Sequence, residues 1–137
     1  MNQTTTATIL LIALIAATLL LSTAETAKAE NTIRITADGT ITGTNLIHRQ
    51  GNIYTFTSNI ENTHGITIEA DNIQINGANY TLKGTETETG ITITYKTNIT
   101  ITNLQITNYF YGIVLDGSIN CNIHENTLKN RVCGIWL

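Results

Sequence analysis

Glu69 and Asp116 are the acidic residues whose positions in the sequence could bring two carboxylates together. Each lies four residues after a glycine, Gly65 or Gly112, that opens a short segment, "GITIE" or "GIVLD". If these segments occupy equivalent places in a repeat, the carboxylates share one outward column and lie about 9 to 10 Å apart. Inverting glycosidases use carboxylates at a similar separation, so the pair is a candidate for acid–base chemistry. Solvated strand ends explain the pair as well, since no third Asp, Arg or Lys lies in the column.

Aromatic residues form the second kind of candidate site, a surface that stacks on sugar rings. They fall in neighbouring repeats and are Tyr95, Tyr109, Tyr111 and Trp136. Flat rings exposed on one face are what such a surface needs. Ordinary packing along strand edges explains these rings equally well, so both interpretations stay open.

Metal ligands and paired cysteines are poorly represented. His48, His64 and His124 are scattered without ligand spacing, and the only Met is the initiator, so the sequence predicts no metal site. Cys121 replaces an inward Ile and is expected to behave as a small buried hydrophobe. A disulfide between Cys121 and Cys133 stays open in an exported protein.

A repeat of about 22 residues must position these side chains. Gly65, Gly90, Gly112 and Gly134 open similar segments at spacings of 25, 22 and 22 residues. From about residue 30 onward, short runs alternate a branched apolar residue with Thr, Gln or Asn, which is typical of strands. Three short strands in each 22-residue period predict one coil of a right-handed parallel β-helix.

Stacking of such coils predicts which residues face inward. We expect the helix to begin around residue 50, with burial of Ile99, Ile101, Ile113, Leu115 and Ile123. The expected inward columns comprise Ile91, Ile93, Ile113, Leu115, Ile135 and Leu137 in one strand, Ile73, Ile99 and Cys121 with Ile75, Ile101 and Ile123 in the next, and Ile106 with Leu128 in the third. Recurring asparagines predict ladders at two turns, Asn72, Asn98 and Asn120 at one and Asn108 and Asn130 at the other.

The N-terminal segment is of a different kind. The uninterrupted apolar run from Ala7 to Leu21 precedes Ala27-Lys28-Ala29, so residues 1–29 are expected to be a signal peptide or an uncleaved membrane anchor. A buried core helix is a third, weaker interpretation. Residues 30–137 then form the β-helix domain of about four coils. Export to the periplasm, the cell surface or the medium follows from the first two interpretations, and membrane contact is expected only through residues 7–21.

Composition restricts the partners. Charged residues make up 12% of the chain, the net charge is −3 and proline is absent. A chain with no basic surface is not expected to bind nucleic acid.

The recurring "GI-I…NI-I-N…I-N…GI" pattern resembles the right-handed parallel β-helix repeats of the superfamily that includes pectate lyases, polygalacturonases and NosD-like periplasmic copper-binding proteins. The resemblance covers Ile66 to Leu137 well and Ile33 to Thr63 loosely, and Ile68 to Gly84 is especially similar to the first coils of NosD-like and surface β-helix proteins. It implies a fold and no single activity, because the shared residues are those that stack. Lyases of the superfamily use Asp-bound calcium and a basic residue, yet no basic residue of the matching coils lies in a recognisable motif: Lys83, Lys96, Lys129 and Arg131. Calcium or copper is implied only for a longer protein.

Two functional hypotheses follow. The first is an exported, non-catalytic module that binds a polysaccharide or a cell-surface glycan or serves as a scaffold. The alternative is the N-terminal part of a polysaccharide-degrading enzyme, or of a NosD-like copper-insertion protein. We also expect the chain to be the N-terminal piece of a longer β-helix, packed against further coils, because the last segment, "GIWL", opens another coil.

Overall fold

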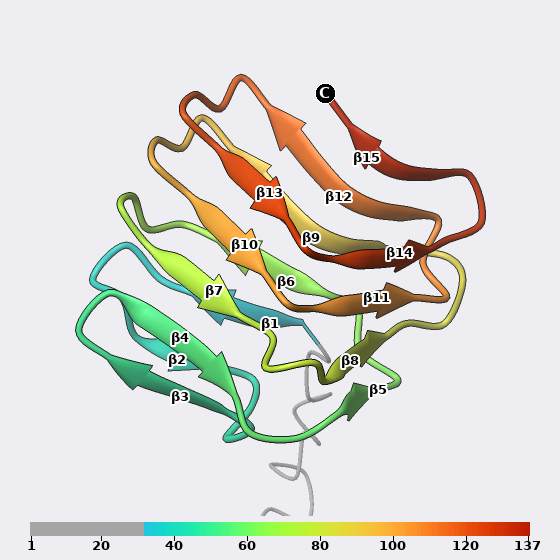
Figure 1. Cartoon of the computed structure of the whole chain (residues 1–137), viewed down its shortest axis with the longest axis horizontal. Coiled ribbons are helices and arrows are strands. Elements are labelled where there is room, and N and C mark those ends of the chain that lie inside the picture. The colour runs from blue at the N-terminus through green and yellow to red at the C-terminus, as the bar shows by residue number, and fades with distance from the viewer. Residues whose placement is uncertain (1–31) are drawn as a thin grey trace, which may run out of the picture.

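Short strands wind into a parallel β-solenoid. The computed structural model of the protein describes residues 32–137, and this part of the chain is all β-structure, with strands gathered into three sheets. Figure 1 shows the coils as successive layers, from cyan and green at one end to red at the other. Each complete coil adds one strand to every sheet.

The three sheets are named A, B and C in the order in which a coil visits them. Sheet A contains, in chain order, β1 (Ile33–Ile35), β2 (Ile41–Thr42), β6 (Ile66–Ile68), β9 (Thr89–Thr94), β12 (Tyr111–Asp116) and β15 (Cys133–Trp136). Sheet B contains β3 (Ile47–Gln50), β4 (Ile53–Phe56), β7 (Gln74–Asn76), β10 (Thr100–Thr102) and β13 (Asn122–His124). Sheet C contains β5 (Ile60–Glu61), β8 (Thr81–Lys83), β11 (Gln105–Thr107) and β14 (Thr127–Lys129).

Parallel pairing between coils sets the predicted columns. In sheet A, Ile91 pairs with Ile66 on one side and with Ile113 on the other. In sheet C, Ile106 pairs with both Leu82 and Leu128. Partners are 22 residues apart in the last two coils and 25 apart for Ile66 and Ile91, so the glycine spacings in the sequence are the register of sheet A.

The core confirms most of the predicted inward residues. Ile99, Ile101 and Ile113 are completely buried and Leu115 nearly so. Ile123 is only partly buried, contrary to the prediction, because it lies in the last coil and has a column neighbour, Ile101, on one side only. Cys121, which was expected to be buried, is also only half-buried, although it packs against the core.

The N-terminal part differs from the prediction. The solenoid begins before residue 50, because β1 already pairs in parallel with β6. Two short antiparallel pairings follow, β1 with β2 and β3 with β4, and they place β2 and β3 at the edges of sheets A and B. Behind them Tyr54 and Phe56 are buried, and the Tyr54 hydroxyl donates to the Gly39 carbonyl at 2.8 Å.

Asparagines lie at both turns where ladders were predicted, and their side chains act in two different ways. Asn72, Asn98 and Asn120 all have a positive φ between 55° and 58°, and Asn98 Nδ2 donates to Asn72 Oδ1 at 2.8 Å. Asn108 has a positive φ of 60° as well. The Asn130 side chain instead forms hydrogen bonds with the backbone of the preceding coil: it accepts from the Tyr109 amide and donates to the Ile106 carbonyl. The Asn130 bonds satisfy turn backbone that the strand ladders do not reach, whereas the Asn98–Asn72 bond joins two side chains.

The predicted signal peptide or anchor, residues 1–29, lies outside the described residues. Within residues 32–137 no helix is long and apolar enough to cross a bilayer.

Because neighbouring coils lie close together, equivalent glycines should differ in how well they tolerate an added side chain. A Cβ at Gly90 would collide with the Gly112 carbonyl and the Ile106 side chain, whereas a Cβ at Gly134 would make only ordinary contact with Leu128. Gly90→Ala should therefore lower the free energy of unfolding by about 1 to 3 kcal/mol, as overpacking does. Gly134→Ala, the matched control in the last coil, should change it little. Urea unfolding of both variants measures the difference, and equal losses would contradict the stacking register.

The tight turn before β2 predicts a weak acid dependence of stability. Hydrogen bonds from the Thr36 hydroxyl, and then from the backbone and hydroxyl of Thr40, lower the pKa of Asp38 from 3.8 to about 2. A folded-state pKa below the unfolded one gives stability that is complete above the unfolded value and is lost as pH falls through the folded one. The stability advantage of the native chain over Asp38→Asn should shrink as pH falls from 4 to 2. A difference that is constant with pH would contradict this.

Candidate functional site

The outer face of sheet A carries most of the residues that the sequence singled out. In the register of β6, β9 and β12, Thr67 lies beside Thr92 and Thr92 beside Val114, all outward. The last strand places Trp136 beside Val114. We call this surface the sheet A face, formed by the outward side chains Thr67, Glu69, Thr92, Thr94, Val114, Asp116, Tyr111 and Trp136.

Glu69 and Asp116 lie in one column, in the arrangement that the sequence indicated. Asp116 pairs with Thr94. Because Ile68 pairs with Ile93, the next residue, Glu69, lies beside Thr94, and Thr94 therefore separates the two carboxylates. Two rungs correspond to about 9 to 10 Å. Glu69 is engaged in a salt bridge, since Arg34 Nη1 lies 2.9 Å from its Oε1. Of these two carboxylates, Asp116 is the one that forms no ion pair within residues 32–137.

Tyr111 and Trp136 form an aromatic pair at the edge of the sheet A face. Their ring centroids are 5.7 Å apart and their planes differ by 22°, which is a stacked arrangement. Phe110 meets Tyr111 edge to face, with centroids 4.9 Å apart. Trp136 remains 53% exposed, so a broad ring surface faces solvent and is held in place by its neighbour.

The other two aromatic candidates lie elsewhere. Tyr95 is 74% exposed but sits at the opposite end of the strands, in the turn after β9, with its ring against Gly117. Tyr109 is completely buried, and its ring lies against Gly84 and Gly90, so it presents no surface to a ligand. Asn108, with its positive φ, precedes Tyr109 and interrupts the strand alternation from which an outward position was expected.

A polar hollow lies at the corner where sheet C leads into sheet A. It encloses about 430 Å³ and is lined by Glu86, Asn108, Lys129, Asn130 and Arg131. These residues come from equivalent turns of three successive coils, and Asn108 lies three residues before Tyr111 of the aromatic pair. Sequence reasoning named the two basic residues without assigning them a role. The repeat alignment could have placed them at one corner, because Lys129 and Arg131 both fall in the segment that aligns with Thr107 to Tyr109 of the preceding coil.

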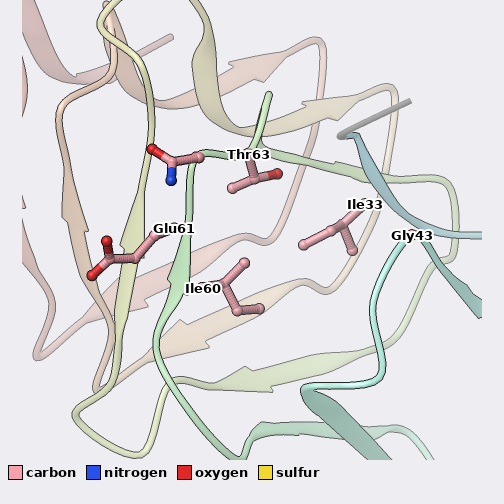
Figure 2. Close-up of a pocket in the computed structure, with 6 residues that line it drawn as sticks. Ile33, Gly43, Ile60, Glu61 and Thr63 are labelled. Atoms are coloured by element: carbon pink, nitrogen blue, oxygen red, sulfur yellow. The ribbon is translucent and has the colours of Figure 1, made fainter. Parts of the chain in front are cut away.

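A second, smaller pocket lies near the N-terminal end of the solenoid. Its volume is about 100 Å³, and Figure 2 shows Ile33 and Ile60 on two sides of it, with the Glu61 carboxylate turned away from Ile33. Glu61 instead lies 3.7 Å from Lys83 on the outside of sheet C. Sites for small-molecule ligands are typically about 300 to 1,000 Å³, so this pocket is too small for a sugar ring.

Histidines and cysteines do not gather into a metal centre. Among the residues from 32 to 137, no three His, Cys, Asp or Glu side chains converge on one point. Cys121, directly before β13, and Cys133, in β15, are both free thiols, so the disulfide that the sequence left open is not formed. On the surface, His124 Nδ1 lies 3.7 Å from Glu125 Oε2.

No protein-family model, curated protein or solved structure matches the chain. The β-solenoid is therefore established by its own sheet pairing, and a functional argument has to start from the residues on its surface.

Burial of Tyr109 predicts that its hydroxyl destabilises the fold. The hydroxyl is buried and has no hydrogen-bond partner within the described region, and burial raises the pKa of the phenol. Tyr109→Phe should raise the free energy of unfolding by about 1 kcal/mol, because it removes an unsatisfied polar group. Tyr54→Phe is the matched control, since it breaks the bond to Gly39 and should lower stability by a similar amount. Thermal unfolding of both variants tests this, and a loss of stability in Tyr109→Phe would contradict it.

Proposed function

We propose that the protein is a carbohydrate-binding module that holds a glycan on the sheet A face. The observation that carries this proposal is the stacked Tyr111–Trp136 pair, with more than half of the Trp136 side chain open to solvent. Sugar rings bind to flat aromatic rings through their apolar faces, and a ring already held by a neighbour loses little conformational freedom on binding.

Polar groups beside the aromatic pair support the same proposal. Thr67 and Thr92 form an outward hydroxyl column that runs toward Trp136, and Thr94 and Asp116 form the next column. Hydroxyl and carboxylate groups at fixed rung spacing are suitable partners for the hydroxyls of an extended saccharide. The site is shallow and open, which fits binding along a chain better than enclosure of a small molecule.

Hydrolysis is a second candidate function, favoured by the column that Glu69 shares with Asp116. Their separation of two rungs is near the upper end of the range used by inverting glycosidases. The salt bridge from Arg34 weighs against this candidate, because it occupies one of the carboxylate oxygens of Glu69. A role in copper insertion has no supporting cluster among the described residues.

Location is part of the proposal. An exported module on a cell surface, in a periplasm or in the medium would meet polysaccharides, and the apolar N-terminal run in the sequence favours such a location. A scaffold role is compatible with glycan binding, since a solenoid presents its outward columns as a rigid surface.

Trp136→Ala should weaken glycan binding by about tenfold or more, because truncating an exposed aromatic anchor costs at least about 1.4 kcal/mol of binding energy. A glycan array carrying neutral and acidic glycans identifies ligands for the native chain, and titration calorimetry with the retained glycans gives the affinities. Trp136→Phe should keep part of the binding. Tyr80→Ala, which removes an exposed ring in the turn before β8, is the matched control and should bind like the native chain.

Two results would overturn the proposal. Equal losses in Trp136→Ala and Tyr80→Ala would show that the aromatic pair is not the binding surface. Release of reducing sugar from a retained glycan, abolished by Asp116→Asn, would favour the hydrolytic candidate instead.

A further inference from the structure

We propose that the hollow between sheets C and A binds an anionic substituent, a carboxylate or a sulfate ester, on the glycan held by Tyr111 and Trp136. This inference rests on the proposed function and adds the chemical class of the ligand. The hollow, called here the corner hollow, is the one lined by Glu86, Asn108, Lys129, Asn130 and Arg131.

Backbone hydrogen bonds between coils fix the shape of the corner hollow. The Glu86 amide donates to the Asn108 carbonyl at 2.7 Å, and the Asn108 amide donates to the Lys129 carbonyl at 3.1 Å. The Arg131 amide donates to the Tyr109 carbonyl at 2.8 Å, which ties the last turn to the coil below. The side chains of the hollow therefore project from a rigid base that requires no folding on binding.

Charge in the corner hollow is unbalanced in favour of an anion. Elsewhere in the described region Arg34 is paired with Glu69 and Lys83 with Glu61. None of the ion pairs formed within residues 32–137 involves Lys129 or Arg131, and both side chains are exposed. Glu86 is the single acidic residue that lines the hollow, so two positive charges face one negative charge. That balance matches one anionic group.

Geometry of the donors favours a planar or tetrahedral oxyanion. Arg131 offers the forked guanidinium donors that bind carboxylate or sulfate oxygens in pairs, and Lys129 adds a point charge. Asn130 is already committed on both sides of its amide, whereas the exposed Asn108 side chain makes no hydrogen bond within residues 32–137. Asn108 is therefore available for a neighbouring sugar hydroxyl.

Proximity links the corner hollow to the aromatic pair. Asn108 and Tyr111 are three residues apart, which limits the distance between their Cα atoms to about 10 Å. Val132, between Arg131 and the strand that carries Trp136, has its amide bonded to the Phe110 carbonyl at 3.0 Å. One oligosaccharide can therefore touch the rings and place a charged substituent in the hollow.

Affinity gel electrophoresis with dextran, carboxymethyl-dextran and dextran sulfate tests this inference, because the three probes share one backbone. The native chain should be retarded about tenfold more strongly by at least one charged probe than by dextran, as expected for one charge-assisted contact. Retardation by carboxymethyl-dextran identifies a carboxylate ligand and retardation by dextran sulfate alone a sulfate ester. Arg131→Gln and Lys129→Gln should each remove most of this preference and leave binding to dextran unchanged.

Lys96→Gln is the matched control, because it removes one positive charge from the turn after β9, at another corner of the solenoid. If Lys96→Gln and Arg131→Gln lost the preference for charged probes equally, the preference would be an effect of net charge alone, and the inference would be overturned. Equal retardation by all three probes, sensitive to Trp136→Ala, would also overturn it and leave the proposed function standing. A charge preference that depends on Arg131 but not on Trp136 would support the anion site and contradict the aromatic surface.

Discussion

Parallel register between coils is the constraint on which the rest of the structure depends. A coil of 22 residues has no apolar partner within itself, so each inward Ile is covered by the equivalent Ile of the coils above and below. The register that aligns Ile91 with Ile113 also fixes the outward neighbours. Thr94 beside Asp116 and Val114 beside Trp136 are consequences of core packing, and no separate interaction has to place them.

The fold was largely predictable because two periods coincide in the sequence. Alternation of Ile with Thr gives the face of each strand, and the glycine spacing gives the partner in the next coil, so the inward positions of residues such as Ile99 and Ile113 follow from the sequence alone. The antiparallel strands β2 and β3 follow neither period. Gly51 and Asn52 form the loop between Gln50 and Ile53, and a two-residue Gly-Asn loop between alternating runs is a hairpin signal that repeat matching overlooked.

The candidate site was predictable only in part. Alternation within a strand places Thr94 and Asp116 correctly, because the backbone there is regular. At the corners the alternation ends, since Asn residues with positive φ redirect the chain, and Tyr109 turns inward against expectation. The corner hollow is a product of these turns, so no strand period could bring Glu86, Asn108 and Arg131 together. The salt bridge of Arg34 with Glu69 joins β1 to the residue after β6. It was hidden because the separation of β1 from β6 in the sequence departs from the 22-residue period.

The stacking of coils makes the distances between outward groups discrete. Because equivalent residues from β9 onward lie 22 positions apart and in register, duplication of one of these coils would move the two sides of the insertion apart by one strand spacing, about 4.8 Å. The distance between two outward groups, such as the carboxylates of Glu69 and Asp116, can thus change only in equal steps. An insertion of about 66 base pairs, three for each residue of a coil, adds one coil and therefore one such step. Related proteins could in this way match their surface to polymers with different repeat lengths.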